Sequence, residues 1–206
     1  MLVSQYRWLM GATAVGIACK EGVVLASEKR LAYGTFVASR NVMKVFKIND
    51  RVGMACAGLI GDVQLLLREL RYNVNLYQYM YVRRIHPRSV ARILSLLLQS
   101  RRLFPMIAQI VIGGIDDEGK ARVYSLDPLG SVIEDNYTAV GTGTEIAIGV
   151  VESYYRPDMS IDEAKELAIR AIKRAVSRDA MSGDGIDIII ITKEGIRTES
   201  VPLTST

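Results

Sequence analysis

The order in which strand-like and helix-like segments follow one another constrains this chain more than any other feature. Short β-rich segments come in pairs joined by turns, and pairs of longer segments with apolar residues at helical spacing separate these hairpins. A parallel βαβ sheet would instead place one helix between successive strands. The order therefore predicts an α+β fold, in which helices pack on the faces of antiparallel sheets.

The predicted hairpins are joined by turns that contain Gly, Asn or Asp, which favour turn conformations. We predict strands over residues 13–19, 23–27, 44–48, 52–57, 107–115, 121–125, 131–133, 186–192 and 196–201. No linker, repeat or low-complexity segment divides the 206 residues. Because domains hold roughly 150 residues each, the length predicts a single domain.

The helical segments also come in pairs. Pro87 separates the two helices of the first pair, which carry leucines at helical spacing. The last helix is expected to begin with a capping box, in which Ser160 and Glu163 satisfy each other's free backbone N–H. The first three helices are predicted over residues 62–81, 89–102 and 145–155.

Histidine chemistry is restricted because the chain holds one histidine, His86. Zinc sites with several histidines and the two-histidine metalloprotease helix are excluded, and a Ser-His-Asp or Cys-His site would need His86 itself. This residue lies in a polar junction just before Pro87 and a predicted helix. We therefore expect a solvated loop histidine.

The sequence also lacks the usual cofactor motifs. It contains no GxxxxGK[ST] loop, no GxSxG elbow and no cluster of metal-ligand residues. The segment 141–145 (GTGTE) lies between a strand and a helix and resembles the start of a dinucleotide fingerprint, but Ile146 replaces its third glycine. We expect a turn that serves a site through its hydroxyls and amides, and neither a cofactor nor a metal.

Basic residues gather in one part of the chain. Lys and Arg number 26 against 22 Asp and Glu, a net charge of +4, and the pI is near 9.1. Between Arg68 and Arg102 eight arginines face only one acid, Glu69. Such a surface could bind nucleic acid or an acidic partner subunit. Because no nucleic-acid motif accompanies it, we predict a protein interaction face and no nucleic acid.

Cysteine usage and hydropathy indicate the compartment. Cys19 and Cys56 lie in apolar stretches outside any CxxC pair, which predicts buried, reduced thiols. The first ten residues hold Arg7 and lack the apolar core of a signal peptide. No run reaches the ~18 to 20 apolar residues that span a bilayer. We expect a soluble, cytoplasmic chain with no membrane association.

Lys44 is unusual because apolar residues surround it in a predicted strand. A buried ammonium needs a carboxylate partner or a functional reason. Glu28, just after the first hairpin, is a candidate partner. From these residues alone an ordinary surface lysine on an edge strand is the favoured interpretation.

Several spaced motifs together resemble one family. They are TAVGI at 13–17 with GVVLA at 22–26, EKR at 28–30, Lys44, AG at 57–58 with GD at 61–62, GGID at 113–116, YSLDPLG at 124–130, and RD at 178–179 with SGDG at 182–185. In this order and spacing the chain resembles a β subunit of the proteasome core particle, of the archaeal type. The resemblance covers nearly the whole chain.

The resemblance implies a fold and an activity. Family members are N-terminal nucleophile hydrolases with a four-layer α/β/β/α sandwich of antiparallel sheets, and they cleave peptide bonds without ATP in protein degradation. Their nucleophile is a threonine that autocatalytic cleavage of a propeptide exposes after a glycine. The free α-amine, with a pKa near ~8, accepts the proton, so no histidine is needed. By position, the implied site residues are Ala12 at the nucleophile position, Glu28, Lys44, Gly58 with its oxyanion N–H, Thr142, Asp179 and Ser182.

The chain departs from the family at the nucleophile itself. Gly11, the expected cleavage position, is followed by Ala12, which has no hydroxyl. We therefore expect residues 1–11 to remain as an uncleaved propeptide ahead of a single domain over 12–206, and the chain to be inactive. Thr13 is a poor substitute, because successive side chains on a strand point to opposite faces and would aim it away from Lys44.

Two origins for Ala12 stay open. An engineered Thr-to-Ala change that traps the precursor agrees with the retained Lys44 and Glu28, since a silent site does not need them. A naturally silent β subunit, kept for assembly beside an active one, agrees with Thr142 and Ala32, where the family more often has Ser and Thr. An α-type subunit of the same fold is disfavoured, because only eleven residues precede Ala12.

The resemblance also implies a substrate pocket and partners. With threonine in place of Ala12, the pocket residues would favour hydrophobic side chains before the cleaved bond. The expected partners are α subunits and other β subunits in stacked heptameric rings, with unfolded polypeptides as substrates. A purely structural ring subunit that uses its basic helices as ring contacts is the competing interpretation. The pocket residues by family position are Leu31, Val42, Cys56 and Ile60.

Overall fold

The computed structural model describes residues 11–203. Its first sheet is five-stranded and antiparallel, in the order β10-β1-β2-β11-β12. The predicted opening and closing hairpins therefore lie side by side, because β2 pairs with β11. The strands are β1 (Thr13–Ala18), β2 (Gly22–Glu28), β10 (Tyr137–Gly141), β11 (Gly185–Thr192) and β12 (Gly195–Pro202).

The second sheet is also five-stranded and antiparallel, and its strands follow one another in chain order, β5-β6-β7-β8-β9. Short turns join most of them, as the turn residues predicted. β5 and β9 are the edge strands. The strands are β5 (Val45–Lys47), β6 (Val52–Gly58), β7 (Ala108–Ile115), β8 (Ala121–Leu126) and β9 (Val132–Asp135).

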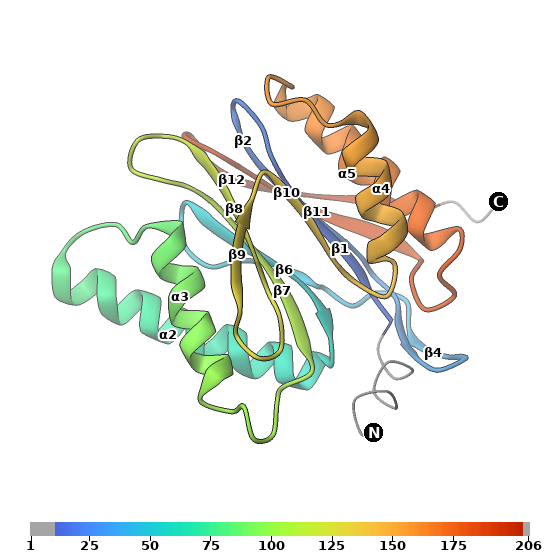
Figure 1. The fold of residues 1–206 in the computed structure, drawn as a ribbon, viewed down its shortest axis with the longest axis horizontal. Coiled ribbons are helices and arrows are strands. Elements are labelled where there is room, and N and C mark those ends of the chain that lie inside the picture. Colours follow the sequence, from blue (N-terminus) through green and yellow to red (C-terminus); the bar gives the residue numbers. More distant parts are fainter. Residues whose placement is uncertain (1–10, 204–206) are drawn as a thin grey trace.

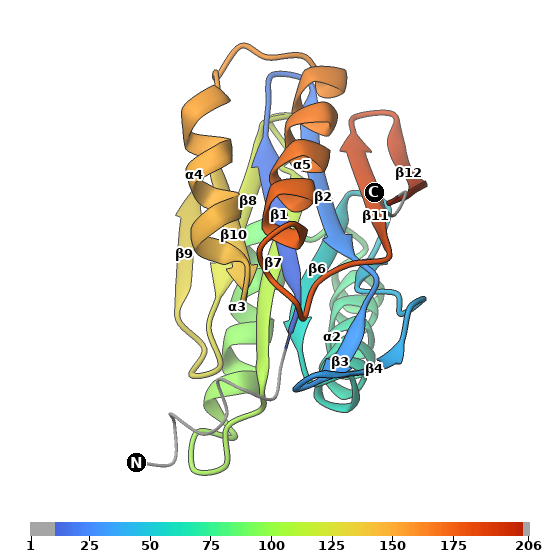
Figure 2. The same cartoon turned by 90° about the vertical axis from the view of Figure 1, so that its right-hand side faces the viewer.

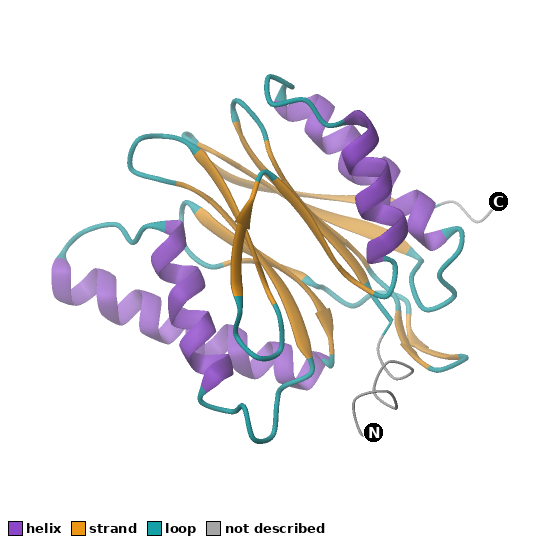
Figure 3. Ribbon diagram, in the orientation of Figure 1, coloured by secondary structure: helices purple, strands orange, loops and turns teal. Residues whose placement is uncertain are grey.

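Each sheet carries one helical pair on its outer face, and the two sheets face each other (Figures 1 and 3). This arrangement confirms the predicted α+β fold, a four-layer α/β/β/α sandwich. α2 and α3 cover the second sheet, and α4 and α5 cover the first. The helices are α2 (Ile60–Tyr81), α3 (Pro87–Gln99), α4 (Thr144–Tyr154) and α5 (Ile161–Val176).

Three clusters of buried apolar side chains fill the spaces between the four layers. One fills the space between the second sheet and α2 and α3, one lies between the first sheet and α4 and α5, and the third lies between the sheets. β1 contributes to two of them, since Ala14 faces the other sheet whereas Val15 and Ile17 face the helices. Ala12 belongs with Ala14 to the cluster between the sheets. The strand period thus decides which layer each residue of β1 meets.

The helices agree with the prediction in number and order, but α2 begins at Ile60 and α3 at Pro87, each two residues before its predicted start, and α3 ends at Gln99. Ser160 Oγ accepts a hydrogen bond from Glu163 N at 3.2 Å and Ser160 N donates to the Glu163 carboxylate at 2.8 Å, so the capping box is confirmed. Pro87 lies inside α3 at its first turn, where a missing N–H costs no bond. His86 Nδ1 caps this helix by accepting from Arg88 N at 3.0 Å.

One hairpin was not predicted. β3 (Leu31–Tyr33) and β4 (Phe36–Ser39) form a two-stranded sheet whose turn holds Gly34 at φ +59°. It projects from the end of the sandwich at which β1 begins (Figures 1 and 2). Its strands are short and largely exposed, so they lack the apolar alternation that reveals a strand in a sequence.

Across residues 11–203, no helix combines the length and the apolar character needed to cross a bilayer. The predicted propeptide lies, except for Gly11, outside the described residues.

Candidate active site

The predicted site residues converge on the start of β1. Ala12 directly precedes this strand and is 1% exposed. Its backbone N–H donates to Thr142 Oγ1 at 3.3 Å, and its carbonyl accepts from Thr142 N at 2.8 Å. Thr142 lies between β10 and α4, so the turn predicted at 141–145 holds the backbone of Ala12.

Glu28 and Lys44 form a buried ion pair beside this backbone. Glu28 ends β2 and Lys44 immediately precedes β5, and their side chains are 0% and 1% exposed. Lys44 Nζ donates to Glu28 Oε1 and to the carbonyl of Arg30. Lys44 is therefore not a surface residue, and Glu28 is its partner.

The Glu28 carboxylate is also held by backbone donors. Oε2 accepts from Arg30 N at 2.6 Å and from Gly183 N at 2.9 Å, while Oε1 accepts from Thr13 N at 3.4 Å. Burial raises the pKa of this carboxyl, and Lys44 and the two nearest N–H groups oppose that rise. The Glu28 carboxylate accepts all of these hydrogen bonds and donates none, so the geometry fits its ionised form.

A second network reaches the same backbone from the other side. Asp179 Oδ2 accepts hydrogen bonds from Thr142 Oγ1 and, at 2.7 Å, from Ser182 Oγ. Since Thr142 Oγ1 in turn accepts from Ala12 N, the carboxylate of Asp179 acts on the Ala12 nitrogen through one hydroxyl. The structure thus joins Thr142, Asp179 and Ser182 in one network, and Thr142 connects this network to the Ala12 nitrogen.

Thr13 is fully buried, and its hydroxyl lies in this second network. Thr13 Oγ1 lies 2.9 Å from Ser182 Oγ, and because the Ser182 proton goes to Asp179, Thr13 is the donor. Its hydroxyl contacts Ser182 and not Lys44, in agreement with the opposite faces of a strand. A Cβ on Gly143 would lie 2.2 Å from Thr13 Oγ1, so only glycine fits beside it.

Gly58 ends β6 with φ +132°, a conformation that favours glycine. A Cβ at this position would lie 2.2 Å from the carbonyl oxygen of Ile107. The neighbouring Leu59 N donates to that same oxygen at 2.7 Å, which fixes the two segments against each other. The glycine that the sequence singled out is therefore required by backbone geometry.

Gly58→Ala is expected to lower the free energy of unfolding by more than about 2 kcal/mol, because alanine meets both an unfavourable φ and the Ile107 carbonyl. Chemical denaturation of the purified chain measures this. Gly61→Ala is the matched control, since nothing lies within 4 Å of its Cβ position in α2 and no positive φ occurs there. Similar unfolding free energies for the two variants would contradict the prediction.

The predicted pocket residues differ in exposure. Leu31, Val42 and Ile60 are half-buried, whereas Cys56 is fully buried in the cluster beneath α2 and α3. Cys56 Sγ donates to the Lys44 carbonyl at 3.3 Å, and burial raises the pKa of its thiol to about 12. Cys56 therefore lies in the core and hydrogen-bonds to the Lys44 backbone. Leu31, Val42 and Ile60 are the predicted pocket residues that a ligand could reach.

Two charged residues next to the site received no role from the sequence. Arg30 Nε donates to Asp184 Oδ2 at 2.8 Å, and Arg30 Nη1 donates to the Ala180 carbonyl at 2.9 Å. The EKR motif contained Arg30, but its partners lie about 150 positions away in the chain. Only the pairing of β2 with β11 brings them together.

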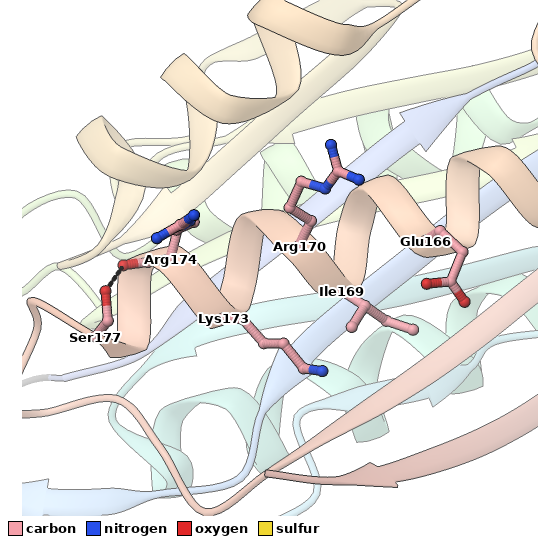
Figure 4. A pocket seen from close by; sticks show the side chains of 6 residues that line it. All are labelled: Glu166, Ile169, Arg170, Lys173, Arg174 and Ser177. Carbon is pink, nitrogen blue, oxygen red and sulfur yellow. Dashed lines mark hydrogen bonds between the residues drawn. The ribbon is translucent and has the colours of Figure 1, made fainter. Parts of the chain in front are cut away.

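A hollow on α5 is lined by none of these residues; Figure 4 shows the side chains that line it. Its lining residues all come from this one helix and its C-cap, and Ser177 Oγ closes one end by donating to the Arg174 carbonyl at 2.7 Å. Within the described part of the chain, no group of three or more His, Cys, Asp or Glu side chains could hold a metal ion. The site around Ala12 is thus the place where buried charges and hydroxyls converge.

Known proteins resemble this chain over almost its full length. A family model described as proteasome subunit matches residues 9–191. Proteasome subunit beta 1 of Ignicoccus hospitalis is 50% identical over 194 residues, which cover 93% of this chain and 97% of that protein. Proteasome subunit beta 2 of Pyrobaculum calidifontis is 48% identical, with 94% and 95% covered, and proteasome subunit beta 1 of Hyperthermus butylicus is 47% identical, with 97% and 98% covered. The chain therefore belongs to the family of proteasome β subunits.

Proposed function

We propose that Ala12 occupies the position of a threonine nucleophile, and that this chain is a silent, unprocessed β subunit of the proteasome core particle. The observation that carries the proposal is that two networks hold the backbone at a residue without a hydroxyl: Thr142, linked to Asp179 and Ser182, accepts from Ala12 N, and Glu28, paired with Lys44, accepts from Thr13 N. The family implies a peptidase that assembles with α and β subunits.

The surroundings of Ala12 suit an N-terminal threonine nucleophile. A hydroxyl there would attack the peptide carbonyl, and its proton would pass to the free α-amine. The ammonium of Lys44, held by Glu28, would favour the deprotonated hydroxyl, and Thr142 would orient the amine. The N–H of Gly58 would stabilise the oxyanion.

Ala12 removes two of the groups that this mechanism needs. Its methyl side chain cannot attack a carbonyl, so the Gly11–Ala12 bond is not cut by the chain itself. Without that cut, the Ala12 nitrogen stays an amide, which donates to Thr142 and has no lone pair to accept a proton. The nucleophile and the base are therefore lost together, and residues 1–11 remain attached.

A silent subunit still contributes to assembly. We propose that the chain joins α subunits and an active β subunit in stacked rings of seven in the cytoplasm, where unfolded polypeptides are cleaved at the partner's sites. The basic surface between Arg68 and Arg102 is the proposed ring contact. The intact ion pair and hydroxyl network favour an engineered Thr-to-Ala precursor over a naturally silent subunit, and both origins predict the same silent site.

Intact mass after co-assembly tests the unprocessed state. We expect the mass of this chain to keep residues 1–11 in particles that also contain α subunits and an active β subunit. The active subunit is the internal control, because it must lose its own propeptide in the same preparation. If the chain loses residues 1–11 while the control is processed, cleavage occurs in trans and the unprocessed state is wrong.

A further inference from the structure

The carboxylate of Asp184 binds two arginines from different parts of the chain. Its Oδ2 accepts from Arg30 Nε at 2.8 Å, and its Oδ1 accepts from Arg30 Nη2 at 3.3 Å and from Arg40 Nη1 at 2.8 Å. Hydrogen bonds from Arg30, above all, lower the pKa of Asp184, so its carboxylate is ionised at neutral pH. Hydrogen bonds between charged groups are shorter and roughly twice as strong as those between neutral groups.

Each of the three segments that meet at Asp184 carries a residue of the site. Arg30 follows β2 and lies two positions after Glu28, Arg40 follows β4 and lies four positions before Lys44, and Asp184 itself lies two positions after Ser182. One carboxylate thus connects the chain segments that hold the acid, the lysine and the serine of the candidate site.

Backbone hydrogen bonds link the loop that precedes Asp184 to Glu28 of the candidate site. Gly183 N donates to Glu28 Oε2 at 2.9 Å, and Lys29 N donates to the Gly183 carbonyl at 3.1 Å. A Cβ on Gly183 would lie 2.5 Å from Arg30 Nη2, so the arginine packs directly on this loop. A shift of the guanidinium would therefore move a donor that stabilises the Glu28 carboxylate.

We propose that Asp184 is a positioning residue of this site: by binding Arg30 and Arg40, it holds the loop of Ser182 and Gly183 against Glu28. The inference rests on the proposed function, since it concerns the same site. Asp184 does not touch the Ala12 position itself, and it acts through the residues that do.

The backbone conformation at Asp184 allows its charge to be removed without straining the loop. Its φ is +72°, in the left-handed region, where Asn and Asp are the non-glycine residues best tolerated. Asp184→Asn therefore keeps the backbone conformation and removes the charge. Asp158→Asn is the matched control, because Asp158 lies in an exposed turn and its Oδ1 is 3.9 Å from Arg156 Nε.

Amide hydrogen exchange of the chain with Ala12 in place is the first measurement. In Asp184→Asn we expect exchange at least several-fold faster in residues 179–185 and in 40–44, with α5 unchanged. Arg40→Gln should speed exchange in 40–44 only, because the Arg30 contacts remain. Exchange rates in Asp184→Asn that equal those of Asp158→Asn would overturn the proposal.

The pH dependence of peptide hydrolysis is the second measurement, made with Ala12→Thr chains assembled with α subunits and with a partner β subunit whose own nucleophile is replaced by alanine. Lys44 is the charged side chain that acts on Glu28 directly, and Arg30 lies among Glu28, Asp179 and Asp184. Activity requires a deprotonated α-amine and an ionised Glu28, so the acid limb of kcat/KM reports both groups. Loss of the Gly183 donor disfavours the ionised Glu28, so Asp184→Asn should move the acid limb upward and make it steeper.

The outcomes separate this inference from the proposed function. Reduced activity without a shift of the acid limb would show that Asp184 only stabilises the fold, and would overturn the positioning role. An inactive Ala12→Thr parent would contradict the proposed nucleophile position, while faster exchange in Asp184→Asn would still support the positioning role.

Discussion

Ala12→Thr is expected to convert the silent chain into one that cleaves itself directly after Gly11 and then hydrolyses peptides. The hydroxyl would be added at a residue whose N–H already donates to Thr142, next to Thr13, whose N–H donates to the Glu28 carboxylate that binds Lys44, so no other residue has to change. Because loss of a nucleophile removes about 10⁶ in kcat in a hydrolase, we expect at least about 10³-fold more hydrolysis than in the parent. Intact mass and a fluorogenic peptide assay measure the two effects, on particles in which the partner β subunit carries alanine at its own nucleophile position and so contributes no hydrolysis.

Ala12→Val is the matched control for this gain. Valine has the shape of threonine but no hydroxyl, so it tests whether a larger side chain alone alters the site. It should keep residues 1–11 and show no hydrolysis. With an inactive partner subunit, cleavage in the valine variant would mean that another residue of this chain performs the chemistry, and the nucleophile position would then be wrong.

The active variant also tests the pocket. Leu31, Val42 and Ile60 are half-buried apolar residues that a substrate side chain could contact. Peptides with a hydrophobic residue before the cleaved bond are therefore expected to react fastest, because burial of an apolar side chain contributes about 1.5–3 kcal/mol. Preference for acidic or basic residues at that position would contradict the pocket assignment.

The sequence predicted the layers of this fold better than the details of its site. Strands and helices differ in their apolar period, and Ser160 with Glu163 formed the capping box that the local sequence specifies. The hairpin of β3 and β4 escaped prediction because it is short and exposed. Hydrophobic periodicity reveals a strand only where one face of the strand is buried, and little of this hairpin is buried.

Contacts between distant segments were beyond the reach of local patterns. The burial of Lys44 depends on how β2 and the segment before β5 meet in the folded sandwich, and the sequence alone left a surface lysine open. Likewise, nothing in the EKR motif indicates that Arg30 contacts Asp184, since that contact arises from the pairing of β2 with β11. The family resemblance located Glu28, Lys44 and Gly58, but it indicated no role for Asp184.

Lys44→Met is expected to produce the largest loss of stability. The substitution leaves the Glu28 carboxylate buried without its cation, and breaking a buried pair in this way costs about 3–5 kcal/mol. Chemical denaturation of the purified chain at pH 8 measures the loss. Lys29→Met is the matched control: Lys29 is partly exposed and lies 3.4 Å from Asp187, so its loss should cost about 1 kcal/mol or less.

The loss in Lys44→Met should also depend on pH, with a definite sign. Burial raises the pKa of Glu28 above its ordinary value of 4.5, and removal of Lys44 removes the main opposing effect, so the folded pKa rises further. The folded variant then binds a proton more readily than the unfolded chain, and its stability falls as pH rises from about 4.5 through the raised folded pKa. Denaturation at pH 5 should therefore show a smaller loss than at pH 8, and a loss that stays constant or grows toward low pH would mean that Glu28 does not carry the buried charge.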